Sequence, residues 1–472
     1  MITILFGGCV QTTVNPIDEE IQAIENGLQT AISIKTDSSD TYSILDRMAY
    51  YHVPGISISV VKDGEIRWSK GYGLANTIDS IEVNTNTLFQ AGSISKPISA
   101  LAPLKLMEEG KLGLDVDVNQ YLKDWKIEDN KLTNESKVTM RRLLTHTAGT
   151  TVYGFPGYSQ SDTLPTLEQV LNGEGNSQKV VVSSMPGSGW SYSGGGYTTM
   201  QKVIEDVSEI SFEAYMEENF FKPLDMSNTT FRHLDPKNDR HKASAAYDSN
   251  GELIKGYWHN YPEQAAAGLW TTPEDLAKYC VEIQQILNGK QNGILKRTTV
   301  EAMLTKHLND WGLGPQLVWS GDSLRFQHNG KTVGFATDMI AFAHQGNAVI
   351  VFANGDDGRL LINEILRSVS NYYGWNIISS KEVEVVNLKS TQLDSLVGKY
   401  SFDPTSSEPM FEISSDGIHL ILDARERGEF EFLALDSMNF IDLKTGRELF
   451  FDLSGEQIQL VWNKEDKFYK ID

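Results

Sequence analysis

Alternating apolar and polar positions mark the first clear strands of this chain. Residues 55–62 alternate as a strand does, Asp63-Gly64 is typical of a tight hairpin turn, and residues 65–72 return as a second strand. The pattern then changes, because apolar residues recur at helical spacing over residues 95–109 and Gly110 follows. This part of the chain is therefore predicted to mix strands and helices.

The same mixture continues further along. Thr272 is a predicted helix cap, with Pro273 at the first helical position and Asp275 completing a pattern like a capping box. Three short strands and a helix follow, at residues 324–328, 335–343, 348–353 and 359–373. We therefore expect one domain of mixed type over residues 25–378.

No helical period survives near the end of the chain. From about residue 396 roughly eight short strand-like runs follow one another with tight turns between them, which predicts a small antiparallel barrel. Examples are residues 410–413, 418–422, 430–435, 448–453 and 458–462. We assign residues 1–24 to a leader or tether, 379–395 to a linker and 396–472 to the barrel.

Composition narrows the class of protein. Of 472 residues 40% are hydrophobic, as in a chain that forms a folded core. Lys and Arg number 41 against 63 Asp and Glu, so the formal net charge is −22. Such a charge repels phosphate backbones and argues against a nucleic-acid partner. No apolar stretch approaches the roughly 18 residues of a membrane-spanning helix.

The two cysteines, Cys9 and Cys280, predict neither a disulfide framework nor a zinc site. Cys280 falls in the helix after Thr272 and is expected to be a small core residue. Leu5-Phe-Gly-Gly-Cys9 resembles a bacterial lipobox, whose cysteine carries a lipid anchor. Two interpretations stay open, a lipoprotein or a chance match. The first predicts a periplasmic or cell-envelope location.

Two Ser-x-x-Lys tetrads occur, and geometry separates them. Ser59 and Lys62 lie on a predicted strand, where residues three apart point to opposite faces. Ser93 and Lys96 lie at the start of a predicted helix, where residues three apart share a face. Free N–H groups at a helix start also favour developing negative charge. Ser93 is therefore the candidate nucleophile.

Three ordered motifs resemble those of the serine β-lactamase and penicillin-binding-protein superfamily. They are Ser93-x-x-Lys96, Tyr192-Ser-Gly194 and His328-Asn-Gly330, beside that family's Ser-x-x-Lys, Tyr-x-Asn and Lys-or-His-x-Gly. The segments 143–149, 186–197 and 267–278 are similar to the family's as well, and the resemblance covers roughly residues 25–375.

The resemblance implies an α+β fold of the β-lactamase/transpeptidase type, with an antiparallel sheet flanked by helices and an all-helical part. More loosely, the tail resembles the lipocalin-like barrel appended to D-aminopeptidases and archaeal peptidases of this family. For this barrel two roles stay open: it shapes substrate access, or it is a stabilising appendage.

The resemblance also implies roles for the motif residues. Ser93 is the nucleophile and Lys96 its base, provided burial keeps the amine neutral. Tyr192 passes a proton to the leaving group and helps to activate water. His328 orients Tyr192 or meets a substrate carboxylate, and is charged part of the time near neutral pH. The backbone N–H groups of Ser93 and Lys331 form the oxyanion hole.

Three further residues are expected to contact substrate: Gly194, Asn329 and Gly330, the last keeping its strand open. Gly194 is a departure, because the family's second motif usually ends in Asn, which binds the substrate amide. This departure makes acyl esters a more plausible substrate and puts β-lactam and peptide turnover in doubt.

Other features have alternative interpretations. His146 is assigned a structural, hydrogen-bonded role, and the aromatic segment 153–158 either lines the cleft or packs as a loop. We expect no metal and no cofactor, since no ligand spacing, phosphate loop or dinucleotide fingerprint occurs. Absence of Gly-x-Ser-x-Gly argues against the α/β-hydrolase fold.

The predicted activity is a serine hydrolase that acts through an acyl-enzyme on amide bonds of D-amino-acid peptides or β-lactams. The alternatives are an esterase on the same scaffold, and a non-catalytic or penicillin-binding protein. The expected partner is a small-molecule or peptide substrate. Oligomeric state is left open.

Overall fold

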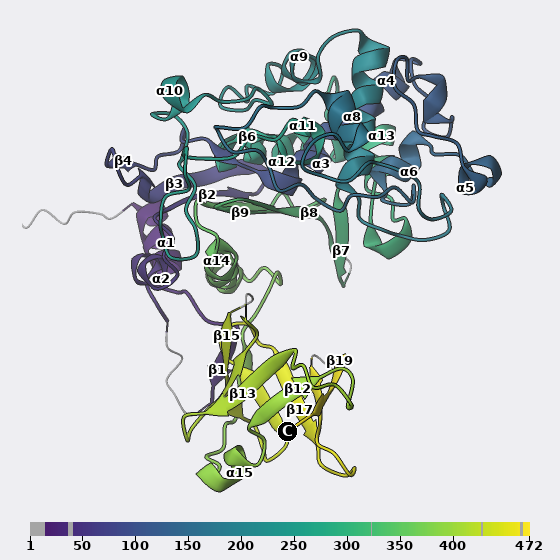
Figure 1. The fold of residues 1–472 in the computed structure, drawn as a ribbon. Coiled ribbons are helices and arrows are strands. Elements are labelled where there is room, and N and C mark those ends of the chain that lie inside the picture. Colours follow the sequence, from purple (N-terminus) through teal and green to yellow (C-terminus); the bar gives the residue numbers. More distant parts are fainter. Residues whose placement is uncertain (1–14, 36–40, 322, 426–427, 463–465) are drawn as a thin grey trace, which may run out of the picture. The chain divides into compact units, whose positions relative to one another are not determined.

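The structure, a computed structural model, describes residues 15–35, 41–321, 323–425, 428–462 and 466–472. It divides into two compact units, Leu45–Ile362 on the one hand and Met1–Ile44 with Asn363–Asp472 on the other (Figure 1). The second division point falls inside helix α14 (Gly358–Tyr373). Each unit is described below by itself.

A seven-stranded sheet in the order β4-β3-β2-β10-β9-β8-β7 forms the centre of the first unit. Its strands are β2 (Gly55–Lys62), β3 (Glu65–Asn76), β4 (Ile81–Glu82), β7 (Gln316–Ser320), β8 (Ser323–Thr332), β9 (Phe335–Phe342) and β10 (Ala348–Ala353). All pairings are antiparallel, which confirms the predicted hairpin and the three predicted strands. Strands β9 and β10 are buried on both faces, which explains why they read as apolar runs.

Strand β8 leaves one of its edges partly uncovered. Strand β7 pairs with β8 only as far as Gln327, so residues 328–332 have no strand partner on that side among the described residues. The short helix η1 (Gly92–Ile94) packs against this stretch instead. The free edge of the sheet therefore lies beside the segment that carries Ser93.

The predicted helix over residues 95–109 forms, but in two parts: α3 (Ser95–Ser99) and α4 (Leu101–Glu108). Proline at position 103 has no N–H to donate to the Ser99 carbonyl, and its ring crowds that carbonyl. The hydrogen-bond ladder is interrupted there, and Ala100 separates the two parts.

Helices α8 (Gly194–Ser208), α11 (Gln264–Ala267) and α12 (Pro273–Leu287) lie on the same side of the sheet as α3 (Figure 1). Thr272 caps α12 as predicted, accepting a hydrogen bond from the Asp275 N–H at 3.1 Å. The predicted capping box is wrong in its second half, because the Asp275 carboxylate accepts from the Asn228 N–H and the Thr229 hydroxyl instead. Cys280 is fully buried in α12, as expected of a core residue.

The shorter elements complete this unit. They are α2 (Ile44–Tyr50), η2 (Val118–Gln120), α5 (Lys131–Glu135), α6 (Met140–Leu144), α7 (Leu167–Asn172), α9 (Phe212–Met216), η3 (Glu217–Phe221), α10 (Pro236–Asp239), α13 (Arg297–Met303), η4 (Leu308–Asp310), and the paired strands β5 (Phe89–Gln90) and β6 (Trp270–Thr271).

The second unit contains the predicted barrel, a closed eight-stranded antiparallel structure in which each strand pairs with its neighbours in sequence. Its strands are β12 (Gly398–Ser401), β13 (Phe411–Ser415), β14 (Leu420–Asp423), β15 (Glu429–Ala434), β16 (Asn439–Asp442), β17 (Glu448–Asp452), β18 (Gln459–Trp462) and β19 (Asp466–Lys470). Inward-facing aromatic and aliphatic side chains such as Tyr400, Phe432 and Phe451 fill the interior. Closure leaves the sheet with no free edge.

Secondary structure also occupies the stretches predicted as tether and linker. Helix α1 (Pro16–Glu25) begins at an Asn15 cap, with Pro16 at its first position. Strand β11 (Lys381–Val383) pairs in parallel with β1 (Ile32–Ile34), and α15 (Ser390–Asp394) follows. The domain boundaries drawn from the sequence stay predictions, and Cys9 lies outside the described residues.

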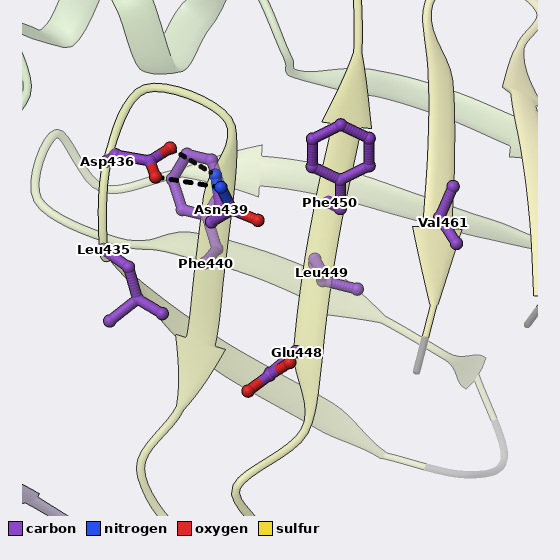
Figure 2. A pocket seen from close by; sticks show the side chains of 8 residues that line it. All are labelled: Leu435, Asp436, Asn439, Phe440, Glu448, Leu449, Phe450 and Val461. Carbon is purple, nitrogen blue, oxygen red and sulfur yellow. Dashed lines mark hydrogen bonds between the residues drawn. The ribbon is translucent and has the colours of Figure 1, made fainter. Parts of the chain in front are cut away.

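A pocket of about 530 Å³ lies on the barrel strands β16, β17 and β18 (Figure 2). It is lined by Leu435, Asp436, Asn439, Phe440, Glu448, Leu449, Phe450 and Val461. The Asp436 carboxylate is occupied by the N–H and the amide of Asn439, each at 2.9 Å. These lining side chains include no nucleophile beside a base, so we assign no catalysis to this pocket.

Candidate active site

The candidate nucleophile and base meet one helical turn apart. The Lys96 side-chain nitrogen Nζ lies 3.1 Å from the Ser93 hydroxyl oxygen. Ser93 is partly exposed, whereas Lys96 is only 2% exposed. An accessible hydroxyl is thus paired with a buried amine, as nucleophilic catalysis by serine requires.

Burial decides the charge of Lys96. It lowers the pKa of the amine from 10.5 to about 7, and no carboxylate is among the causes of that shift. The Nζ atom donates instead to the backbone carbonyl of Ala266 at 2.7 Å, and it lies 4.9 Å from the centre of the Tyr192 ring. The amine can therefore be neutral near pH 7 while remaining aimed at the Ser93 hydroxyl.

Tyr192 closes the triangle. Its phenol lies near enough to Ser93 for hydrogen bonding by the Ser93 hydroxyl to act on the phenol pKa, which that hydroxyl lowers. Burial raises the pKa of this phenol above its ordinary value of 10, so it stays protonated at neutral pH. Between the two groups, Lys96 is therefore suited to accept a proton and Tyr192 to donate one.

His146 holds the segment that carries Tyr192, which agrees with the structural role predicted for it. Its Nδ1 accepts a hydrogen bond from the Ser193 N–H at 3.0 Å, and its carbonyl accepts from the Ser191 N–H at 2.8 Å. The His146 ring stacks on Tyr192 with centroids 4.3 Å apart. Burial lowers the pKa of His146 well below 6.5, so the ring is neutral.

His328 lies near the same phenol, with ring centroids 6.2 Å apart, and is 5% exposed. Burial, followed by the charges of Lys96 and Arg359, lowers its pKa to about 3. The expectation of a partly charged histidine is therefore wrong. Its Nδ1 lies 2.6 Å from the Asn329 carbonyl, an acceptor, so the proton is assigned to Nδ1 and Nε2 is left as a hydrogen-bond acceptor.

The backbone of β8 approaches the nucleophile closely. A side chain on Gly92, at φ 54°, would lie 2.8 Å from the Lys331 nitrogen. One on Gly330 would lie 1.9 Å from the Ala91 carbonyl oxygen, so only glycine fits there. The structure thus brings the backbone of Lys331 beside the turn that carries Ser93, where the predicted oxyanion hole requires it.

Two predicted substrate contacts are not supported. Asn329 is exposed and alternates with the buried His328, so its side chain lies on the opposite face of β8. The Gly194 N–H donates to the Tyr153 carbonyl at 3.1 Å and is occupied. The rejected serine, Ser59, bonds to Ser69 across the hairpin at 3.0 Å, which agrees with its exclusion on geometric grounds.

The aromatic segment 153–158 divides between the two interpretations offered for it. Tyr158 is 5% exposed, and its hydroxyl accepts from the Asn176 N–H, which is loop packing. Tyr153 is 75% exposed, and its ring lies 5.0 Å from that of Tyr192. Only the first part of the segment therefore faces the site.

Sequence reasoning missed several supporting residues. The Ser95 hydroxyl donates to the Gly92 carbonyl at 2.6 Å and accepts from the Leu269 N–H at 3.0 Å, which fixes the nucleophile turn. Trp311 packs its ring 5.9 Å from Tyr192 and 5.6 Å from His328. No motif indicates Trp311. Ala266 directly precedes the family-like stretch 267–278, so its place near the site could have been predicted from the sequence.

The described residues offer neither a metal site nor a membrane-spanning helix. Over this part of the chain, no cluster of three or more His, Cys, Asp or Glu side chains has the arrangement of a metal site. No described helix combines the length and the apolar character needed to cross a membrane.

Known proteins are similar to this chain in sequence. The family model for Beta-lactamase matches residues 43–366. "Protein flp" of Staphylococcus aureus strain N315 is 24% identical over 348 residues, which is 71% of this chain and 65% of that protein. The match therefore spans less than two thirds of Flp. "Penicillin-binding protein 4*" of Bacillus subtilis strain 168 is 25% identical over 339 residues, 67% of this chain and 71% of that protein.

Solved structures show the same fold. The octameric penicillin-binding protein homologue from Pyrococcus abyssi has a TM-score of 0.61 at 23% identity, over 90% of this chain and 98% of that one. The D-amino acid amidase from Ochrobactrum anthropi SV3 has a TM-score of 0.57 at 20% identity, over 75% and 99%. The family model covers more than half of the sequence, and the three motifs meet in space. The chain therefore belongs to the Beta-lactamase family.

Proposed function

We propose that this protein is a serine hydrolase that cleaves amide bonds of D-amino-acid compounds or β-lactams through an acyl-enzyme on Ser93. The observation that carries the proposal is the buried Lys96 amine, with a pKa of about 7, at 3.1 Å from the Ser93 hydroxyl. Similarity to penicillin-binding proteins and to a D-amino acid amidase supports this substrate class.

Acylation follows from the protonation states of the site. The Ser93 oxygen attacks the substrate carbonyl carbon and its proton passes to the neutral Lys96 amine. Negative charge develops on the carbonyl oxygen, where the N–H groups of Ser93 and Lys331 would stabilise it. The bond to the leaving group then breaks, Tyr192 gives its proton to the departing nitrogen or oxygen, and Lys96 returns a proton to Tyr192.

Deacylation uses the same groups with water. Water attacks the acyl carbon and its proton passes to the neutral Lys96, directly or through Tyr192. The bond to Ser93 breaks, and its oxygen recovers a proton as the carboxylic acid leaves. His328 would serve as a neutral hydrogen-bond acceptor near Tyr192 and cannot offer a positive charge to a substrate carboxylate.

Ester hydrolysis is the second candidate, and one observation favours it. Gly194 stands where the family's second motif has an amide side chain, so the site lacks that contact for a substrate amide. An ester does not need it. The same acyl-enzyme chemistry applies, with an alcohol in place of an amine as the leaving group.

Three substrates separate the candidates: a p-nitrophenyl ester of a short acid, nitrocefin and a D-alanyl peptide, each with wild type and Ser93→Ala. Turnover of the peptide or nitrocefin that depends on Ser93 supports the amide hydrolase, and turnover of the ester alone supports the esterase. If no substrate is turned over in a Ser93-dependent way, the proposed hydrolase is refuted and a non-catalytic or penicillin-binding role takes its place.

We propose in addition that the chain acts outside the cytoplasm. The lipobox-like Leu5-Phe-Gly-Gly-Cys9 supports this location and a lipid anchor. Metabolic labelling with a palmitate analogue tests the anchor, with Cys9→Ser as control. Label that is absent, or unchanged in the variant, would contradict it.

A further inference from the structure

The space beside the first turn of α8 is already filled. A Cβ atom on Gly194 would lie 2.9 Å from Cε2 of the Phe155 ring and 3.1 Å from the Tyr153 carbonyl oxygen. Both separations are shorter than ordinary van der Waals contact. A side chain at position 194, such as the asparagine of the related motif, therefore requires the Phe155 ring to move, because that ring occupies the adjoining volume.

The segment that fills this space is fastened to α8 by hydrogen bonds at three successive carbonyls. The Thr151 carbonyl accepts from the Ser193 hydroxyl at 2.8 Å, the Val152 carbonyl from the Gly195 N–H at 3.0 Å, and the Tyr153 carbonyl from the Gly194 N–H at 3.1 Å. The N–H groups of Gly194 and Gly195, which have no partner within the first turn of α8, therefore donate to this segment and are not available to a substrate.

Backbone strain shows how firmly the segment is held. Val152 has φ 66°, a left-handed conformation that a β-branched side chain rarely adopts. Such a conformation persists only where the surrounding contacts fix it, and it is concentrated at functional sites. Here the bonds at the carbonyls on either side of Val152 fix it, and they direct Tyr153 and Phe155 toward Tyr192 and Gly194.

Tyr153 and Phe155 form what we term the aromatic wall. Phe155 is partly buried and packs against the core. Tyr153 is 75% exposed, and its ring is tilted by 47° against the Tyr192 ring at 5.0 Å. A large aromatic surface is therefore left open to solvent beside the phenol that faces the reacting carbonyl.

We propose that the aromatic wall determines which acyl groups the site accepts: apolar acyl chains pack on it, whereas acyl groups with an acylamido substituent next to the carbonyl are disfavoured. An apolar chain gains contact area on the Tyr153 ring. An acylamido group, as in penicillins and N-acylated peptides, would place its N–H and C=O against ring carbons with no partner. This inference rests on the proposed acyl-enzyme chemistry. Of the two candidate substrate groups it favours the second, and it narrows the class to esters and amides of apolar carboxylic acids at the expense of penicillins and N-acylated peptides.

The test compares two esters that differ by one substituent, p-nitrophenyl 3-phenylpropionate and p-nitrophenyl N-acetyl-D-phenylalaninate. Each kcat/KM is divided by the rate of hydroxide-catalysed hydrolysis of the same ester, to remove intrinsic reactivity. Wild type is expected to prefer the phenylpropionate on the order of 10- to 100-fold. Preference for the N-acetylated ester would overturn the proposal.

Variants locate the effect in the wall. p-Nitrophenyl acetate serves as the reference substrate, because its short acyl group barely reaches the aromatic wall. Tyr153→Ala is expected to lower the ratio of kcat/KM for p-nitrophenyl 3-phenylpropionate to kcat/KM for p-nitrophenyl acetate about 10-fold. The control is Ile210→Ala, an apolar side chain that is 45% exposed and lies two residues beyond the far end of α8, a helix on the order of 20 Å long. It should leave that ratio unchanged, and an equal effect in both variants would contradict the role of Tyr153.

The melting temperature tests the predicted collision between a side chain at position 194 and Phe155, and this test needs no substrate turnover. Gly194→Asn alone is expected to lower Tm by roughly 5 °C, because the new side chain collides with Phe155. Adding Phe155→Ala should recover most of this loss, so the two effects should not be additive. Additive losses would overturn the claim that Phe155 takes the place of the missing side chain.

Measurements of ligand binding test the aromatic wall independently of the proposed hydrolase activity. In Ser93→Ala, calorimetry should show 3-phenylpropionate bound about 10-fold more tightly than N-acetyl-D-phenylalanine, whether or not the wild type turns over esters. Equal affinities would refute the wall. Absence of Ser93-dependent ester turnover, together with this binding preference, would refute the proposed hydrolase and leave the wall as a binding surface.

Discussion

The protonation of Lys96 gives the sharpest prediction. The neutral amine is the base, so the rate of acylation should follow its population. With the pKa lowered from 10.5 to about 7, half of the molecules hold a neutral amine at pH 7. A lysine at its ordinary pKa would be neutral in about 3 molecules in 10,000, so burial raises the reactive population on the order of 10³-fold.

The sign of the pH dependence follows directly. Below about pH 7 the amine is charged, and kcat/KM should fall tenfold for each further unit. Above about pH 8 the amine is neutral and kcat/KM should level off. Tyr192 does not add a second limb near neutrality, because burial keeps its pKa above the ordinary value. His146 and His328 are already neutral there.

The assay is the rate of p-nitrophenyl acetate hydrolysis against pH, corrected for hydroxide and for the rate of Ser93→Ala. Lys96→Arg is the matched variant, because guanidinium stays charged throughout the range. At about pH 8, where the wild-type amine is neutral, its activity should be on the order of 10³-fold below that of wild type, and it should not follow the wild-type pH profile. A profile that is flat between about pH 5 and about pH 9, or one whose midpoint lies near the ordinary lysine pKa, would refute the assignment of Lys96 as a buried neutral base.

Three changes of stability follow from the same buried groups. Lys96→Met should stabilise the fold by about 2–4 kcal/mol below pH 7, where the wild type buries an ammonium, and this advantage should shrink as the pH rises from 7 toward 10.5. Chemical denaturation at several pH values measures the free energy of unfolding of both proteins. A difference between them that does not change with pH would contradict the lowered pKa of Lys96. The pKa of His328 is about 3 in the fold, so the free energy of unfolding of wild type should fall by about 1.4 kcal/mol for each pH unit below 6.5. His328→Gln lacks this group and should unfold less readily in acid than wild type. If the free energy of unfolding falls with pH equally steeply in both proteins, the burial of His328 as a neutral ring is contradicted. His146→Ala should lower the free energy of unfolding by about 1–3 kcal/mol by leaving the buried Ser193 N–H without its acceptor, and should lower kcat/KM as Tyr192 loses its stacking partner; unchanged stability and kinetics would remove that role.

Local pattern was enough to predict much of the fold. Asp63-Gly64 between alternating runs predicts the first hairpin, and the Thr272 cap predicts the start of α12; both are confirmed. Ser93 and Lys96 could be paired because they are three residues apart where the turn η1 runs directly into α3, so no distant contact was needed to bring them together. Short strands with turns between them likewise predicted the barrel.

The rest depends on contacts between distant parts of the chain. The carbonyl partner of Lys96 comes from Ala266, 170 residues away, and only the folded structure joins them. The left-handed Val152 goes against its own propensity and is fixed by hydrogen bonds from α8, so the aromatic wall has no local signal. The charge of His328 was mispredicted because burial, which sequence spacing does not reveal, sets its pKa.

Peptide mapping of a quenched reaction tests most directly whether Ser93 carries the acyl group. Wild type and Tyr192→Phe are mixed with p-nitrophenyl 3-phenylpropionate, stopped with acid during turnover and digested for mass spectrometry. The phenylpropionyl group should be found on the peptide that contains Ser93, in a greater fraction of Tyr192→Phe molecules, whose deacylation is slower. An acyl group on another residue, or wild-type turnover by Ser93→Ala, would contradict the account.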